Sequence, residues 1–171
     1  MKEAFTIYKL IILYTLDRAH SPLTLGLISD YITEHEYTNY FNVQNAFAEL
    51  LDAELISCSQ TYNTSYYTIT GTGQETLALF VKELSYEIRQ EIDDYLKNNR
   101  HAIVEHTAVV SDYTLNDSGE YIATCSLNEN NRTLFELKIS VPSEEDAIKI
   151  CGNWREQSDT LYQTAVKQLL I

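Results

Sequence analysis

The spacing of apolar residues predicts helices over much of the first half of the chain. Residues 3–18 are apolar on nearly every side, which is typical of a helix enclosed by other elements. Pro22 ends this helix because proline lacks an amide hydrogen and disfavours a helical residue before it. A second helix is expected over about residues 23–34. A third is expected over residues 42–51, where apolar side chains recur at helical spacing and Asn42 is placed as the N-cap.

After the third helix the sequence changes to runs rich in Ile, Thr and Tyr. Two such runs flank the polar residues 61–64, which indicates a β-hairpin with a short turn. Gly71 and Gly73 are expected to end the second strand, and helices are expected over residues 74–84 and 85–100. Three helices, a hairpin and a following helix predict a winged helix-turn-helix with an appended helical linker.

The second half of the chain alternates between apolar and polar positions from His101 onward. Strands are expected over residues 102–115, 119–129 and 132–141. The segments between them are rich in turn-forming residues, including the stretch 128–131. This pattern predicts a three-stranded antiparallel meander.

A long helix is expected after the meander. Pro142 ends the third strand, and residues 143–146 are typical of a helix N-terminus. A three-stranded sheet alone would leave its apolar face wet, so this helix should cover one face. The sequence therefore predicts an α+β protein with a winged helix-turn-helix domain over residues 1–84, a linker helix over 85–100 and a small α+β domain over 101–171. In that last domain the meander is packed by the long C-terminal helix.

The charge of the chain limits its partners. Its formal net charge is −13, and the stretch from 19 to 81 contains seven acidic residues and no Lys or Arg. Contacts to DNA phosphates need several cations, so they would have to come from outside this stretch. The candidates for such backbone contacts are Lys2, Lys9, Arg18 and the run Lys97, Arg100 and His101.

Cysteine usage and hydropathy favour the cytoplasm. Cys58, Cys125 and Cys151 are an odd number with no close spacing, so reduced thiols are expected. The apolar run over residues 10–16 is far shorter than the ~20 residues that a membrane span needs. No membrane segment is therefore expected.

The sequence gives little support for metal or catalytic chemistry. On a strand, His101 and Glu105 would share one face while His106 points to the other, so the three do not form a metal site by themselves. Gly71 and Gly73 precede a helix, but no Lys-Ser/Thr pair follows them to complete a phosphate-binding loop. We expect no enzyme activity, no metal site and no cofactor.

Uncharged side chains could still recognise bases, because Asn and Gln pair bidentately with adenine in the major groove. The candidate DNA-binding residues are Asn39, Tyr40, Asn42, Gln44 and Asn45 around the third helix, with Tyr62, Asn63 and Tyr66 on the hairpin. In the alternative interpretation, Asn42 is only a cap, the other amides form a solvated face, and the hairpin tyrosines pack or contact a protein. A surface that is rich in Tyr and poor in charge is also typical of protein interfaces.

Several stretches carry a resemblance to known proteins. The stretch ending FAELLDAELI, followed by the hairpin and YTITGTG, resembles winged-helix proteins, including PadR-type bacterial repressors. The chain also resembles, over essentially its whole length, a bacterial family called domain of unknown function 4364. Three stretches carry this resemblance: TNYFNVQNAFAELLDAELI, QEIDDYLKNNR and VPSEEDAIKICGNWR. This resemblance implies a winged helix followed by a small α+β domain, usually described as a transcriptional regulator. It brings no catalytic residues.

The resulting expectation is a cytoplasmic transcriptional regulator with a winged-helix DNA-binding domain and a C-terminal dimerisation or sensing domain. A homodimer is expected because helix-turn-helix proteins commonly bind symmetric sites as two-fold dimers. The helices at 74–99 or 144–171 could supply its interface. The alternative is a winged helix that binds another protein and has no role with DNA.

Overall fold

The computed structural model describes residues 6–130 and 132–171. Three parts of the predictions lie outside the described residues. They are the cation Lys2, the expected start of the first helix at residues 3–5, and Asn131 of the turn expected over 128–131. The chain divides into two compact units, the first ending at Ile103 and the second running from Val104 to Ile171. The units are described one at a time below.

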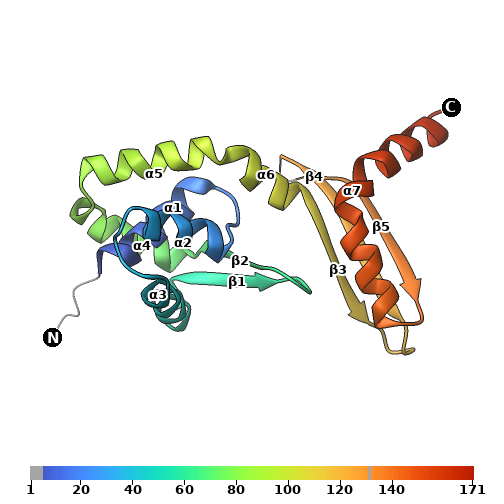
Figure 1. Ribbon diagram of the computed structural model, residues 1–171, viewed down its shortest axis with the longest axis horizontal. Helices are drawn as coiled ribbons and strands as arrows, with labels where there is room; N and C mark the ends of the chain where they lie inside the picture. Colours follow the sequence, from blue (N-terminus) through green and yellow to red (C-terminus); the bar gives the residue numbers. More distant parts are fainter. Residues whose placement is uncertain (1–5, 131) are drawn as a thin grey trace. The chain divides into compact units, whose positions relative to one another are not determined.

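The first unit is helical with one β-hairpin (Figure 1). Three helices come first, then an antiparallel two-stranded sheet, then two further α-helices separated by a short 3-10 turn. This order agrees with the order of helices and strands that the sequence predicts. Its elements are α1 (Ile7–Ala19), α2 (Leu25–Glu34), α3 (Tyr40–Asp52), β1 (Ile56–Gln60), β2 (Ser65–Ile69), α4 (Gly71–Phe80), η1 (Val81–Glu83) and α5 (Tyr86–Asn98).

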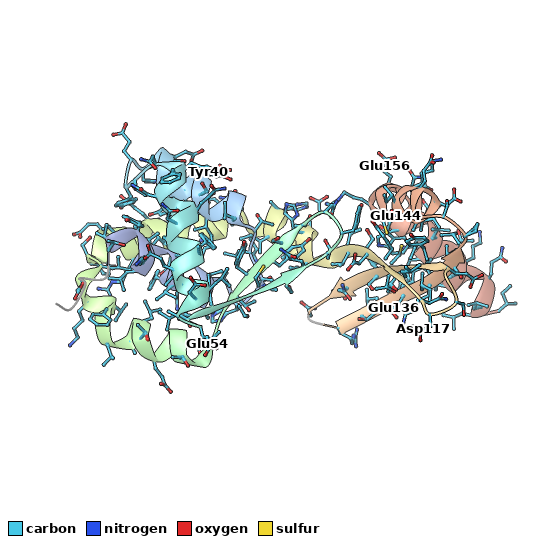
Figure 2. All side chains as sticks on the ribbon, turned by 90° about the horizontal axis from the view of Figure 1, so that it is seen from below. Tyr40, Glu54, Asp117, Glu136, Glu144 and Glu156 are labelled. Carbon is cyan, nitrogen blue, oxygen red and sulfur yellow. The ribbon has the colours of Figure 1, made fainter. Side chains whose placement is uncertain are left out.

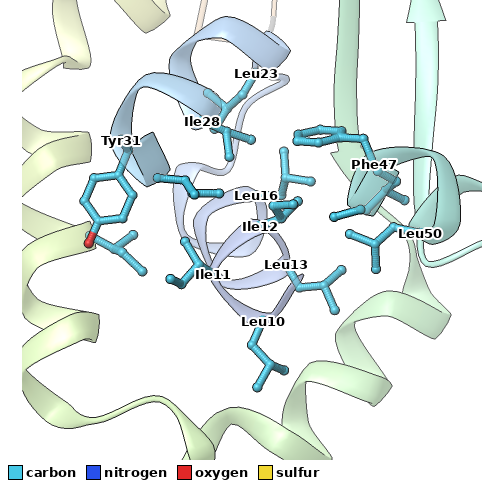
Figure 3. Packing of buried hydrophobic residues seen from close by; sticks show 14 of the residues in the cluster. Leu10, Ile11, Ile12, Leu13, Leu16, Leu23, Ile28, Tyr31, Phe47 and Leu50 are labelled. Atoms are coloured by element: carbon cyan, nitrogen blue, oxygen red, sulfur yellow. The ribbon is translucent and has the colours of Figure 1, made fainter. Parts of the chain in front are cut away.

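The core of the first unit is built around α1. This helix contacts α2, α3, α4 and α5, which explains why it is apolar on nearly every side. Figure 3 shows its side chains pointing outward in several directions, toward Ile28 of α2 on one side and Phe47 and Leu50 of α3 on another. Leu10 and Leu16 of α1 are both almost fully buried. The expected enclosed first helix is confirmed over its described residues.

The helix starts differ from the prediction at two points. Asn39, and not Asn42, is the N-cap of α3, and its side chain accepts a hydrogen bond from the Asn42 amide at 2.9 Å. The helix α4 begins at Gly71, so the glycines lie in its first turn and do not end β2. Thr70 caps this helix by accepting from the Gly73 amide, and its hydroxyl donates to the Glu54 carbonyl at 2.7 Å. The Thr70 side chain thus joins the end of the hairpin to the loop after α3.

The predicted hairpin is present. Strands β1 and β2 pair in antiparallel register from Ile56 with Ile69 to Gln60 with Ser65, and the turn lies over 61–64. Leu23 forms an additional bridge to Tyr67 of β2 on the other side from β1. The hairpin is therefore fixed to the segment before α2 as well as to α3.

The helix expected as a linker corresponds to α5, which packs within the first unit. Its residues Ile92 and Leu96 are buried in the core of that unit. At its surface, Asp93 accepts a hydrogen bond from Arg18 Nε of α1 at 3.0 Å. The Tyr95 hydroxyl donates to the Leu27 carbonyl of α2 at 2.9 Å. Both polar contacts add to the apolar packing of α5.

The helix α6 (Arg100–Ala108) spans the boundary between the units. The expectation of a strand starting at residue 102 was therefore wrong, because residues 102–108 are helical. The Ile103 amide donates to the Asn99 carbonyl at 3.0 Å, which continues the helical hydrogen-bond pattern directly from α5. Ile103 is buried against the core of the first unit, and this contact favours a helix over a strand here.

The second unit is the predicted meander with a helix on one face. Its elements are β3 (Val109–Leu115), β4 (Tyr121–Glu129), β5 (Arg132–Val141) and α7 (Glu144–Leu169). The strands pair in the order β3-β4-β5, all antiparallel. Ala123 and Cys125 of β4 face Cys151 and Trp154 of α7, and all four are buried. The Trp154 indole donates to the Ser126 carbonyl at 3.0 Å, which satisfies its only donor inside the packed layer.

Gly73 is a position where any side chain is predicted to destabilise the first unit. A Cβ atom there would collide with the Leu55 carbonyl oxygen and lie 2.8 Å from Ile69 Cγ1. We expect Gly73→Ala to lower the free energy of unfolding by about 1–3 kcal/mol, the usual cost of overpacking. Urea denaturation of the full chain measures the change.

Gly71→Ala provides the matched control, since a Cβ at Gly71 meets nothing within 4 Å. It should be neutral or stabilising by up to about 1 kcal/mol, because alanine favours helix over glycine. Equal destabilisation by the two substitutions would contradict the close approach of α4 to the loop after α3.

Candidate binding surface of the first unit

The helix α3 has one buried face and one exposed face. Val43, Ala46, Phe47 and Leu50 point into the core. The opposite face is exposed, and Figure 2 labels Tyr40 at the start of the helix and Glu54 just beyond its end. The exposed residues of α3 are Tyr40, Phe41, Gln44, Asn45, Ala48, Glu49 and Asp52. We call the first five of these the α3 outer patch.

Two of the predicted site residues are used to start the helix. Asn39 Oδ1 accepts from the Asn42 backbone amide, and Asn42 Nδ2 donates to Thr38 Oγ1 at 2.8 Å. Asn39 is exposed and Asn42 is partly buried. Their side chains therefore hold the entry into α3, which leaves Gln44 and Asn45 as the amides of the outer patch.

Gln44 is oriented by a neighbour one turn earlier. Its Nε2 donates to the Tyr40 hydroxyl at 3.0 Å, and 52% of the Tyr40 surface is exposed. Asn45 lies next to it and is exposed. Because residues four apart share a helix face, Tyr40 and Gln44 present one combined polar and aromatic surface.

Phe41 is an exposed residue that the sequence interpretation did not single out. It is 69% exposed, the most exposed aromatic residue in the described part of α3. The available signal was the helical phase, because position 41 is two residues before Val43 and so lies nearly opposite the buried stripe. A large exposed apolar side chain beside polar ones often marks an interaction surface.

The hairpin residues form a separate patch. Figure 1 shows the hairpin extending away from α3, so its turn does not lie beside the α3 outer patch. Asn63 in the turn is exposed and accepts hydrogen bonds from the Thr61 and Thr64 hydroxyls at 3.3 and 3.0 Å. Tyr62 and Tyr66 are half-buried. The structure therefore brings together the predicted residues 39–45 and places Tyr62, Asn63 and Tyr66 apart from them.

Two of the cations expected to support DNA contacts are paired with carboxylates. Lys9 forms an ion pair with Glu49 of α3. Arg18 pairs with Asp93, and the hydrogen bond to this carboxylate raises the pKa of the guanidinium above its usual value. Lys9 thus neutralises Glu49 beside α3, and the charge of Arg18 is directed toward α5.

The remaining expected cations lie on other elements. Lys97 is in the last turn of α5 and Arg100 begins α6, and both are exposed. Figure 1 shows α5 on the opposite side of the first unit from α3. The helix that carries Lys97 therefore lies across the first unit from the α3 outer patch.

Charge along α3 itself is segregated. Residues Tyr40 to Ala48 carry no charged side chain, whereas Glu49, Asp52 and the following Glu54 are acidic. The N-terminal end of a helix also carries a partial positive charge from its unpaired amides. The outer patch is thus the part of α3 that repels an anionic partner least.

The residues His101, Glu105 and His106, which were considered above for metal binding, lie on the helix α6. Glu105 forms an ion pair with Arg155 at 3.4 Å, and on the helix α6 it lies one turn from His101. Among the described residues, no three His, Cys, Asp or Glu side chains gather closely enough to hold a metal ion. In the same described parts of the chain, no helix is long and apolar enough to cross a bilayer.

Residues 8–169 match the model of a protein family described as a domain of unknown function (DUF4364). Since the match covers nearly the whole chain, the protein belongs to this family. The family resemblance inferred from the sequence is therefore confirmed. No curated protein and no solved structure matches the chain.

Removing the cap of α3 should destabilise the first unit. We expect Asn39→Ala to lower the free energy of unfolding by about 0.5–2 kcal/mol, because the Asn42 amide loses its acceptor. Asn45→Ala, on the exposed face of the same helix, should change it by less than about 0.5 kcal/mol. Thermal and urea unfolding compare the two, and equal effects would contradict the assignment of Asn39 as the cap.

Proposed function

We propose that the protein is a transcriptional regulator whose first unit is a winged helix-turn-helix that binds DNA through α3. In this proposal α1, α2 and α3 form the helical part, and the β1–β2 hairpin is the wing. The second unit pairs two copies or senses a signal. The protein acts in the cytoplasm.

The observation that carries the proposal is the α3 outer patch. Recognition helices of helix-turn-helix proteins contact base edges through residues near their N-terminal end. That is where Gln44 and Asn45 are exposed, and Tyr40 orients Gln44 by a hydrogen bond. Their amides have the donor and acceptor pattern that pairs with adenine.

The ion pair of Lys9 with Glu49 limits how strongly the first unit is expected to bind the phosphate backbone of DNA. Affinity for any DNA sequence rises with the number of phosphates that cations neutralise, and log K falls with log salt by about 0.9 per phosphate. In this chain Glu49 competes with phosphate for Lys9. The proposal therefore entails weak non-specific binding, a shallow salt dependence and an affinity dominated by base contacts.

Selection from a random duplex library at low salt, followed by titration of the selected duplex, tests this function. The double variant Gln44→Ala/Asn45→Ala should lose at least about tenfold in affinity, because each bidentate amide contact contributes about 1–3 kcal/mol. The double variant Gln90→Ala/Asn98→Ala removes exposed amides from α5 and should bind as the unchanged chain does. Failure to enrich any duplex, or equal losses in the two variants, would refute DNA binding through α3.

Removing the carboxylate of Glu49 should strengthen binding in the same assay. Glu49→Gln is expected to raise affinity for the selected duplex, because the carboxylate that competes with phosphate for Lys9 is then absent. Glu75→Gln is the control, because it removes one exposed carboxylate from α4 and leaves Glu49 in place. An equal gain from both variants would show that only net charge matters.

Binding of a protein partner is the second candidate, and the exposure of Phe41 favours it. Aromatic residues are enriched at protein interfaces and charged residues are depleted at their centres. Phe41→Ser removes the exposed ring and leaves the hydrogen bond between Gln44 and Tyr40 in place. If the outer patch binds protein, Phe41→Ser should abolish capture of the partner while Gln44→Ala/Asn45→Ala weakens it less.

A further inference from the structure

The helix α7 extends beyond the sheet that it covers. Its 26 residues span about 39 Å at the usual rise. Its first part packs on the sheet through the buried residues Ala147, Cys151, Trp154 and Ser158. The Tyr162 ring still lies 5.9 Å from the ring of Phe135, between centroids. After this point α7 projects past the strands of the second unit (Figure 1).

The apolar stripe of α7 continues into the projecting part. The buried residues follow the spacing four, three, four, and Leu161, Ala165 and Leu169 continue the same face. Leu161 is 43% exposed and Leu169 is 81% exposed, and Val166 beside them is 36% exposed. Within the described residues of the second unit, nothing covers this end of the stripe. We call Leu161, Ala165, Val166 and Leu169 the distal α7 stripe.

The charge distribution favours a second copy of the chain as the partner of this stripe. The chain as a whole has a formal charge of −13, so most surfaces of two copies repel each other. From residue 160 to residue 171 the only charged side chain is Lys167. The distal stripe is thus a place where two copies can approach without repulsion between carboxylates.

The order of residues in the stripe is also self-complementary. Leucines stand four positions before and four positions after the small residue Ala165. An antiparallel two-fold crossing at Ala165 would place Leu161 of one copy against the partner's Leu169, and the same contact would repeat on the other side. The small side chain at the centre allows the two helices to approach closely.

We infer that two copies of this chain pair through the distal α7 stripe in an antiparallel two-fold helix crossing centred on Ala165. The inference deepens the proposed function because it names the surface that joins two copies of the regulator. It rests on the proposed function, which gives the dimer its role. Its test contains no DNA. A failure of pairing and a failure of DNA binding are therefore distinguishable.

Sedimentation velocity of the full chain over a concentration series tests the inference. The unchanged chain should be a dimer. Ala165→Glu and Ala165→Lys should each weaken the dimer at least tenfold, because like charges meet at the two-fold axis. An equimolar mixture of the two variants should regain the dimer, since the axis then brings one carboxylate to one ammonium.

Two further variants separate pairing from folding. Leu169→Glu should also give a monomer, and its site is too exposed for the fold of the second unit to depend on it. Thr160→Glu adds the same charge on the opposite, exposed face of α7 and should leave the dimer intact. Far-ultraviolet circular dichroism should be the same for all variants.

Three outcomes would overturn the inference. The unchanged chain could stay monomeric at all concentrations, as it would if its own first unit covered the stripe. Ala165→Glu could stay dimeric with native helix content, which would place the interface elsewhere. The mixture of the two Ala165 variants could fail to pair although each is folded.

Discussion

Enclosure of α1 is the constraint on which the first unit depends. A helix that is apolar on nearly every side is stable in water only when other elements cover it, and α2, α3, α4 and α5 all contact α1. Each covering helix must turn its apolar stripe toward α1, which decides which of its side chains remain outside. For α3 the inner face is fixed by Phe47 and Leu50, so Tyr40, Phe41 and Gln44 must face outward. The candidate surface is therefore a consequence of core packing.

The same packing determines where charge can act. Lys9 of α1 reaches Glu49 of α3, and Arg18 of α1 reaches Asp93 of α5, so the two cations of α1 neutralise the carboxylates of its neighbours. In the proposed function, the ion pair of Lys9 with Glu49 weakens phosphate binding beside α3. What remains on the N-terminal half of α3 is amide and aromatic, which suits recognition by hydrogen bonds and stacking better than recognition by charge.

Periodicity predicted the α+β class, the hairpin, the meander and the long final helix, because each produces a regular apolar pattern in the sequence. The exceptions depend on contacts that a local pattern does not contain. The alternation after residue 101 fits a strand or a short helix, and the burial of Ile103 against the first unit decides for the helix. Asn39 and Asn42 are chemically equal candidates for the cap, and only the backbone conformation at Asn39 distinguishes them. The ion pairs of α1 were not predicted for the same reason, since they join residues far apart in sequence. The outward position of Phe41, in contrast, was available from the helical phase.

In the proposed function, the outer face of α3 is the surface through which the first unit binds its partner. Nuclear magnetic resonance of the ¹⁵N-labelled chain, titrated with a duplex that it selects, tests this claim most directly. The side-chain amide signals of Gln44 and Asn45 should move together and by more than those of Gln90 and Asn98 on α5. Shifts confined to α5 and α6, or no shifts from α3 on binding, would contradict the account.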